Sequence, residues 1–220
     1  MRVIQPEGRR GSLKWKQRAV NDRPFVTQTA LRAAGVPAGD IEWLSPLRTD
    51  SYAEYRDASF LDRIAAPQLR NELAAFWPRR GPQWDGLAVV AGEILLVEAK
   101  AHLAEMLSPR TGASSESRLL IEAALAETVT AFGAKPLAPW SMAFYQLANR
   151  YAFLHFLNAR GVPARLVLLN FVGDVEMDGP SSPAEWHAAY QVAHHVMGLP
   201  RRHPYVSRIA EVCINIADLL

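Results

Sequence analysis

The stretch Asp85-Gly-Leu-Ala-Val-Val-Ala-Gly-Glu-Ile-Leu-Leu-Val-Glu98-Ala-Lys100 decides the fold of this chain. It holds two short apolar runs, 87–90 and 94–97, separated by Ala-Gly-Glu. Apolar runs joined by a short link that contains glycine predict a β-hairpin, here 86–91 paired with 94–100. Because each run is apolar on both faces, we expect these strands to lie inside a sheet that is covered on both sides.

Outside the hairpin, apolar spacing and turn residues predict mostly helices. They predict helices at 57–76 with a break near Pro67, at 115–132, at 141–160, from Pro183 to about 198 and at 205–219, a buried strand at 165–172, and irregular chain over 1–55 apart from a short helix near 27–34. This alternation is typical of an α/β fold, a mixed β-sheet flanked by helices. We expect one domain over 1–220, with an extension at 1–55, a core at 57–172 and a C-terminal helical region at 173–220.

Composition excludes several classes of protein. Half of the 220 residues are hydrophobic and 21% are charged, which is typical of a globular domain rather than a disordered chain. The single cysteine, Cys213, excludes a disulfide within the chain and favours a reducing compartment. No run approaches the length of a membrane span, and no apolar stretch follows the charged N-terminus as in a secretory signal. We therefore expect a cytoplasmic protein with no membrane partner.

The net charge is only +2, but positive charge is concentrated at the N-terminus. Residues 1–23 hold seven basic side chains against Glu7 and Asp22. A basic segment on a near-neutral body is suited to bind a polyanion, so the candidate nucleic-acid contacts are Arg9, Arg10, Lys14 and Lys16. The competing interpretation is that Trp15, Val20 and Phe25 pack this segment onto the domain as ordinary structure.

Three charged side chains lie at the ends of the predicted hairpin strands. Glu98 and Lys100 are two residues apart on one strand, so they project from the same face. The hairpin folds Asp85 back beside the end of that strand, near Glu98. Two carboxylates suit a hard cation such as Mg²⁺, and a lysine can orient a water and offset negative charge. The alternative is a solvated surface ion pair worth at most about 1 kcal/mol, but charges that end a buried strand are usually paired or bound to metal.

The pattern of an acid, a hairpin and Glu-x-Lys resembles the signature of the PD-(D/E)XK, or restriction-endonuclease-like, superfamily of phosphodiesterases. The resemblance covers about residues 60–172. It implies a restriction-endonuclease-like mixed sheet in which Asp85, Glu98 and the main-chain carbonyl of Ala99 bind Mg²⁺ or Mn²⁺, and in which Lys100 is catalytic. It also implies a strand between an acidic helix and the strand that starts at Asp85, for which only 77–84 is available.

The same resemblance suggests roles for residues on two helices. Glu72 matches an additional catalytic acid on the helix before the sheet. Gln146 and Arg150 match a polar patch on the helix after it, although a tyrosine is common at the second of these positions. His102 follows Lys100 by two residues, so it is a further candidate that points into the site.

The sequence therefore predicts a Mg²⁺- or Mn²⁺-dependent nuclease whose partner is nucleic acid, DNA before RNA. A homodimer is the arrangement expected if both strands of a duplex are cut. Two alternatives stay open. One is a module that keeps the fold and binds or assembles on nucleic acid without turnover. The other is an unrelated α/β domain whose acids form structural ion pairs.

Overall fold

A five-stranded mixed sheet forms the centre of the protein in the computed structural model, which describes residues 1–107 and 112–220. The strand order is β2-β4-β5-β6-β7. β4 is antiparallel to both β2 and β5, whereas β5, β6 and β7 are parallel. The bounds are β2 (Glu42–Ser45), β4 (Gly86–Val90), β5 (Glu93–Lys100), β6 (Ala164–Val172) and β7 (Ile209–Asn215), and a separate two-stranded sheet pairs β1 (Arg2–Val3) with β3 (Glu54–Tyr55).

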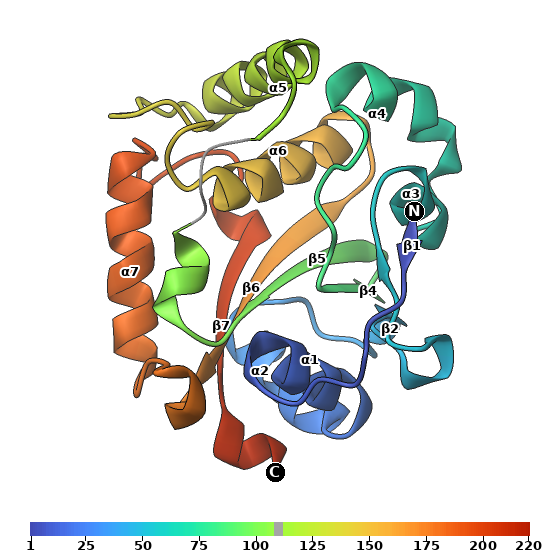
Figure 1. Cartoon of the computed structure of the whole chain (residues 1–220), viewed down its shortest axis with the longest axis vertical. Coiled ribbons are helices and arrows are strands. Elements are labelled where there is room, and N and C mark those ends of the chain that lie inside the picture. Colours follow the sequence, from blue (N-terminus) through green and yellow to red (C-terminus); the bar gives the residue numbers. More distant parts are fainter. Residues whose placement is uncertain (108–111) are drawn as a thin grey trace.

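Helices cover both faces of this sheet (Figure 1). α1 (Gly11–Asn21) and α2 (Pro24–Ala33) lie against one face. α6 (Tyr145–Ala159) lies against the other, with α5 (Ser115–Phe132) outside it and α7 (Pro183–Val196) beside it. Two short helices, α3 (Ala58–Arg63) and α4 (Arg70–Phe76), extend the α6 side. None of the helices in the described residues is long and apolar enough to span a membrane.

The predicted hairpin is confirmed as β4 and β5. Its turn is shorter than expected, because only Ala91 and Gly92 separate the strands. Both residues have positive φ, 48° and 78°, as a two-residue type I′ turn requires. The register opposes Gly86 to Val97, so the residue before β4 falls next to the end of β5. The turn thus fixes where Asp85 lies.

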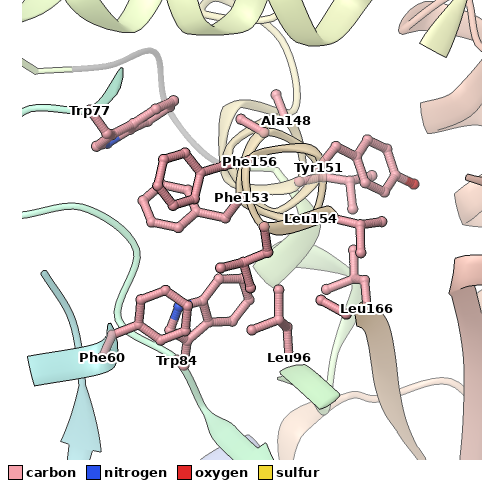
Figure 2. Close-up of a cluster of buried hydrophobic side chains, with 14 of the residues drawn as sticks. Phe60, Trp77, Trp84, Leu96, Ala148, Tyr151, Phe153, Leu154, Phe156 and Leu166 are labelled. Carbon is pink, nitrogen blue, oxygen red and sulfur yellow. The ribbon is translucent and has the colours of Figure 1, made fainter. Parts of the chain in front are cut away.

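α6 is the central helix of the larger apolar core. Its fully buried Leu154 belongs to the same apolar core as Leu96 and Leu166 of the sheet. Phe153 and Phe156 lie at the side of the helix, where Phe153 packs against Trp77 and Trp84 (Figure 2). Burying each such side chain stabilises the fold by about 1.5–3 kcal/mol before entropy is counted. Because α6 is held so firmly, polar side chains at its N-terminal end have fixed positions over the C-terminal end of β5.

Most of the other predicted elements are present. α5 matches 115–132, β6 begins one residue before the predicted strand, and α7 begins at Pro183 as expected. α6 begins at Tyr145 rather than at 141. The predicted helix at 57–76 is divided into α3 and α4 by a 3₁₀ turn that starts at Pro67, because proline cannot donate the backbone hydrogen bond of a continuous helix.

Three predictions about the fold are wrong. α2 matches the short helix expected near 27–34, but the rest of residues 1–55 is not irregular, since it contains α1 and β2. The strand that precedes β4 in the chain and pairs with it is β2, whereas 77–84 contributes only an isolated bridge from Trp84 to Tyr55. The C-terminal segment is strand β7 and not a helix, because the alternate residues Ala210, Val212 and Ile214 are buried, which is the period of a strand.

Candidate functional site

Asp85 is anchored at the edge where β4 begins and β5 ends. Its Oδ2 accepts a hydrogen bond of 2.9 Å from the backbone N–H of Ala99. This bond holds the Asp85 carboxylate beside the peptide that links Glu98 to Lys100. The side chain of Asp85 is 20% exposed, so it is more accessible than Glu54 or Glu98.

Glu98 and Lys100 lie together on the face of β5 that α6 covers. The Lys100 ammonium donates to Glu98 Oε1 over 2.9 Å, and both side chains are almost fully buried. Arg150, from α6, donates through Nε to Glu98 Oε2 over 2.5 Å. The Arg150 guanidinium also lies 4.9 Å from the centre of the Trp84 ring, so it is held by a cation–π contact as well as by charge.

The Lys100 ammonium has an acceptor for each of its three N–H groups. Besides Glu98 it donates to the backbone carbonyl of Glu105 over 3.0 Å and to Gln146 Oε1 over 3.2 Å. A lysine has three donors and no acceptor, so Lys100 is fully satisfied in this arrangement. A substrate oxygen that approaches Lys100 must therefore replace one of these three partners.

Lys16 and Glu54 extend the site on the α1 side of the sheet. The Lys16 ammonium is buried and donates to both Glu54 Oε1 and Asp85 Oδ1. The other oxygen of Glu54 accepts hydrogen bonds from the side-chain amides of Gln5, over 3.0 Å, and Gln83. Glu54 and Asp85 thus share one ammonium between them.

The cluster balances its own charge. Glu54, Asp85 and Glu98 carry three negative charges, and Lys16, Lys100 and Arg150 carry three positive charges. Each oxygen of Asp85 and Glu98 accepts a hydrogen bond from an ammonium, a guanidinium or a backbone N–H. Pairing of this kind is what makes buried charges tolerable in a protein interior.

The pKa values of the two acids that Lys16 bridges are shifted in opposite directions. Burial acts to raise the pKa of Asp85, but the Lys16 ammonium and the Ala99 N–H outweigh it and hold the pKa below its usual value. Burial raises the pKa of Glu54, with a further contribution from Asp85, although Lys16 opposes this. Burial acts to lower the pKa of Lys16, yet the two carboxylates raise it above its ordinary value. Asp85 and Lys16 are therefore both charged at neutral pH.

Glu105, next to Lys100, forms hydrogen bonds that connect its own turn to the end of β5 and to α1. It lies in a 3₁₀ turn, Leu103–Met106, that follows β5. Its carboxylate accepts from the backbone N–H of Ala101 over 2.6 Å and from the hydroxyl of Ser12 on α1 over 2.8 Å. This turn and α1 together cover the edge of the sheet at which Lys100 lies.

The other residues that the sequence suggested for the site differ in whether they contact Glu98 and Lys100. Glu72 is exposed on α4, and no hydrogen bond or ion pair described for the chain joins it to the charged cluster. The His102 side chain lies next to Glu105, 3.9 Å from its carboxylate, rather than against Glu98. Gln146 and Arg150, in contrast, contact Lys100 and Glu98 directly.

Some residues of the N-terminal segment are buried against the domain and others are exposed to solvent. Trp15 and Val20 are buried, as the packing interpretation expects, whereas Phe25 is exposed. Lys16, considered above as a phosphate contact, is instead an internal partner of Asp85 and Glu54. Arg9 and Arg10 are exposed just before α1, and Lys14 lies 4.3 Å from the Trp15 ring. Of the four basic candidates, these three remain accessible to a polyanion.

Sequence reasoning missed Lys16 and Glu54 as members of the site. The signal for Lys16 is its place in α1 between Trp15 and the buried Ala19 and Val20, on the side that faces the sheet. A lysine on the buried side of a helix needs an acid near it. No comparable signal marks Glu54, because its position depends on the pairing of β3 with β1.

The donor atoms suit a hard divalent cation in kind, but the carboxylates are occupied by cations of the protein itself. Asp85 and Glu98 offer carboxylate oxygens, the ligands that Mg²⁺ and Mn²⁺ prefer. Within residues 1–107 and 112–220, no group of three or more His, Cys, Asp or Glu side chains is arranged to hold a metal ion. To bind these carboxylates, a divalent ion would have to displace an ammonium or guanidinium of the protein.

No family model matches this chain, and no curated protein or solved structure matches it significantly. The functional interpretation therefore depends on the site alone.

Proposed function

We propose that this protein is a Mg²⁺- or Mn²⁺-dependent phosphodiesterase that hydrolyses nucleic acid, with DNA as the first substrate to test. The observation that carries the proposal is the hydrogen bond from the Ala99 N–H to Asp85. It joins an acid at the start of β4 to the Glu98-Ala99-Lys100 segment at the end of β5. This bond supports a site formed by two acids and a lysine where β4 begins and β5 ends.

The site residues have distinct roles in this proposal. Asp85 and Glu98, with the carbonyl of Ala99, would hold the ion, which when bound polarises a phosphoryl oxygen and lowers the pKa of a bound water. Lys100 offsets the negative charge that develops on the phosphate and orients the attacking water. Gln146 holds the Lys100 ammonium, and Arg150 fixes the second oxygen of Glu98.

The arrangement of strands supports a restriction-endonuclease-like core for this chain. The PD-(D/E)XK pattern calls for a strand next to the one that bears the first acid, and β2 pairs with β4 in this position. The second helix after the hairpin, α6, packs on the sheet and supplies Gln146 and Arg150, the polar residues that this pattern expects on a helix after the sheet. Glu72 is left out of the proposed machinery.

Exposed basic residues near the start of α1 suit the backbone of a nucleic acid. Arg9 and Arg10 immediately precede the helix whose Lys16 reaches Asp85. We therefore assign them to phosphate contacts, which position a nucleic acid without reading its sequence. If both strands of a duplex are cut together, two copies of the protein would have to supply two sites.

Cleavage assays test the proposal directly. Wild-type protein is incubated with single-stranded DNA, duplex DNA and RNA in Mg²⁺ or Mn²⁺, and compared with Asp85→Asn, Glu98→Gln and Lys100→Met. Each variant is expected to lose roughly 10²–10³-fold or more in turnover, as enzymes do when one electrostatic stabiliser is removed. Glu122→Gln, an exposed acid on α5, is the matched control and should cleave normally. Cleavage that survives in Lys100→Met contradicts the role of that lysine.

A second candidate function is a non-catalytic module that binds nucleic acid. The observation that favours it is the complete internal pairing of Glu98 and Lys100, whose side chains are 2% and 5% exposed. Such a protein would bind DNA or RNA with a salt-dependent affinity but would cleave neither in Mg²⁺ or Mn²⁺. Its binding would also be unchanged in Lys100→Met, which separates the two candidates in one set of measurements.

A further inference from the structure

Lys16 is placed where an added cation would be expected. Its ammonium is bound to one oxygen of Asp85 and one oxygen of Glu54, and all three side chains are largely withdrawn from solvent. Two carboxylates that share a single positive charge form a suitable environment for a cation. Here the chain supplies that charge from α1.

The two acids that Lys16 bridges differ in solvent exposure and in the hydrogen-bond donors that hold their second oxygen. Asp85 is 20% exposed, while the Lys16 and Glu54 side chains are 6% and 5% exposed, so an ion from solvent reaches Asp85 first. The second oxygen of Asp85 is fixed by the Ala99 N–H. Glu54 is fixed separately, because its second oxygen accepts from Gln5 and Gln83. Both acids are therefore held in place without Lys16.

Lys16, in contrast, has a long and flexible side chain. It can withdraw from Asp85 by rotation about its own bonds while it keeps its contact with Glu54. A dication at Asp85 repels the neighbouring ammonium, and this repulsion is strong in a partly buried site. Binding of the ion and the contact between Lys16 and Asp85 thus exclude each other.

We propose that Lys16 is a built-in counter-cation, which neutralises Asp85 when no divalent ion is bound and is retained by Glu54 when one binds. The proposal rests on the metal-dependent function above and adds a regulatory contact to it. Lys16 acts through Asp85, so it is a positioning residue. Its presence sets how tightly the site binds the ion, and Glu54 makes the exchange reversible.

Titration of the full-length protein with Mn²⁺, followed by calorimetry and by the shift in melting temperature, tests this role. Lys16→Met is expected to bind Mn²⁺ at least tenfold more tightly than wild type, because the ion no longer competes with an ammonium. Glu54→Gln is expected to bind at least threefold more weakly, because Lys16 loses its second partner and stays on Asp85. Lys135→Met, an exposed lysine outside the site, should match wild type.

The opposite signs of the two effects separate this role from a merely structural one, which would weaken binding in both variants. Measurable Mn²⁺ binding by wild type with no tighter binding by Lys16→Met overturns the counter-cation role alone. Absence of Mn²⁺ binding in wild type and both variants overturns this role together with the proposed metal dependence. If Lys16→Met does not fold, Glu54→Gln decides, since unchanged or tighter binding by that variant refutes the proposal.

Discussion

Replacing Arg150 with methionine is expected to lower the free energy of unfolding by about 3 kcal/mol. Removal of one partner from a buried ion pair typically costs about 3–5 kcal/mol, because the other charge is left without compensation. Arg150 Nε lies 2.5 Å from Glu98 Oε2, and the two side chains are 5% and 2% exposed. Lys100 still pairs with Glu98 in the variant, which places the cost at the lower end of that range.

A second arginine provides a matched control for this change. Arg70 also lies 2.5 Å from an acid, Asp62, but these two side chains are 54% and 43% exposed. Exposed ion pairs contribute about 0–1 kcal/mol, so Arg70→Met should be nearly neutral. Urea unfolding followed by circular dichroism measures both variants against wild type. Because the two pairs have the same length, the comparison reports the effect of burial together with that of the other contacts of Arg150.

Glu98→Gln and the double variant with Arg150→Met complete a mutant cycle. The cycle removes the contribution of the other Arg150 contacts, which include the carbonyl of Gln83 and the amide of Asn149. Contacting residues in one ion-pair network typically couple by about 0.5–3 kcal/mol, and we expect a coupling of about 2 kcal/mol here. The reasoning is refuted if Arg150→Met costs no more than Arg70→Met, or if the coupling is close to zero.

Three further predictions concern pH, packing and salt. Burial lowers the pKa of His194 to about 4, so between pH 7 and pH 5 the imidazole gains a proton in the unfolded chain but not in the folded chain. Wild type should therefore lose about 2 kcal/mol of stability over this range, and His194→Gln should not. Leu166→Ala, at a fully buried position under α6, should cost about 2–5 kcal/mol in urea unfolding. Arg9→Gln with Arg10→Gln should flatten the plot of log affinity against log salt for duplex DNA by up to about 2 units.

Each of these three predictions is checked against a control variant of the same protein. A pH dependence that is identical in wild type and His194→Gln would contradict the burial of a neutral imidazole. Val175→Ala, at a position 88% exposed, should change stability by less than about 0.5 kcal/mol, in contrast to the core variant. Arg201→Gln with Arg202→Gln removes two other exposed arginines and should leave the salt slope unchanged if binding is confined to the α1 side.

Local patterns are sufficient to predict the hairpin and the acids that it brings together. Residues 86–100 contain two apolar runs and a glycine that adopts positive φ, and the pairing of adjacent strands follows from these features alone. The amino-acid sequence by itself therefore places Asp85 beside the end of β5. The helices α5 and α7 are also predictable, because Gly133 ends one and Ser182-Pro183 begins the other.

Elements whose identity depends on distant neighbours cannot be predicted in this way. β7 joins β6 only after a long connection through α7, and no turn residues link it to a neighbouring strand as they do in the hairpin, so its strand character is not evident from the sequence alone. β2 has four residues and pairs with β4 across the inserted α3 and α4. Without β2, the resemblance points to α4 as the helix that bears the additional acid, whereas the helices that precede the first strand of the large sheet are α1 and α2.

The charged cluster is difficult to explain as a device for stability. Six charges, contributed by α1, β3, α6 and the β4–β5 hairpin, are withdrawn from water at one edge of the sheet. Buried ion pairs of this kind often add nothing to stability, and apolar residues of similar volume can replace them with a gain of about 1–4 kcal/mol. The surrounding aromatic core around Trp84 and Phe153 supplies ample apolar contact without them. A cluster of charges that requires four segments to form therefore fits the proposal above, in which an ion or a phosphate displaces an internal partner of its carboxylates and lysines.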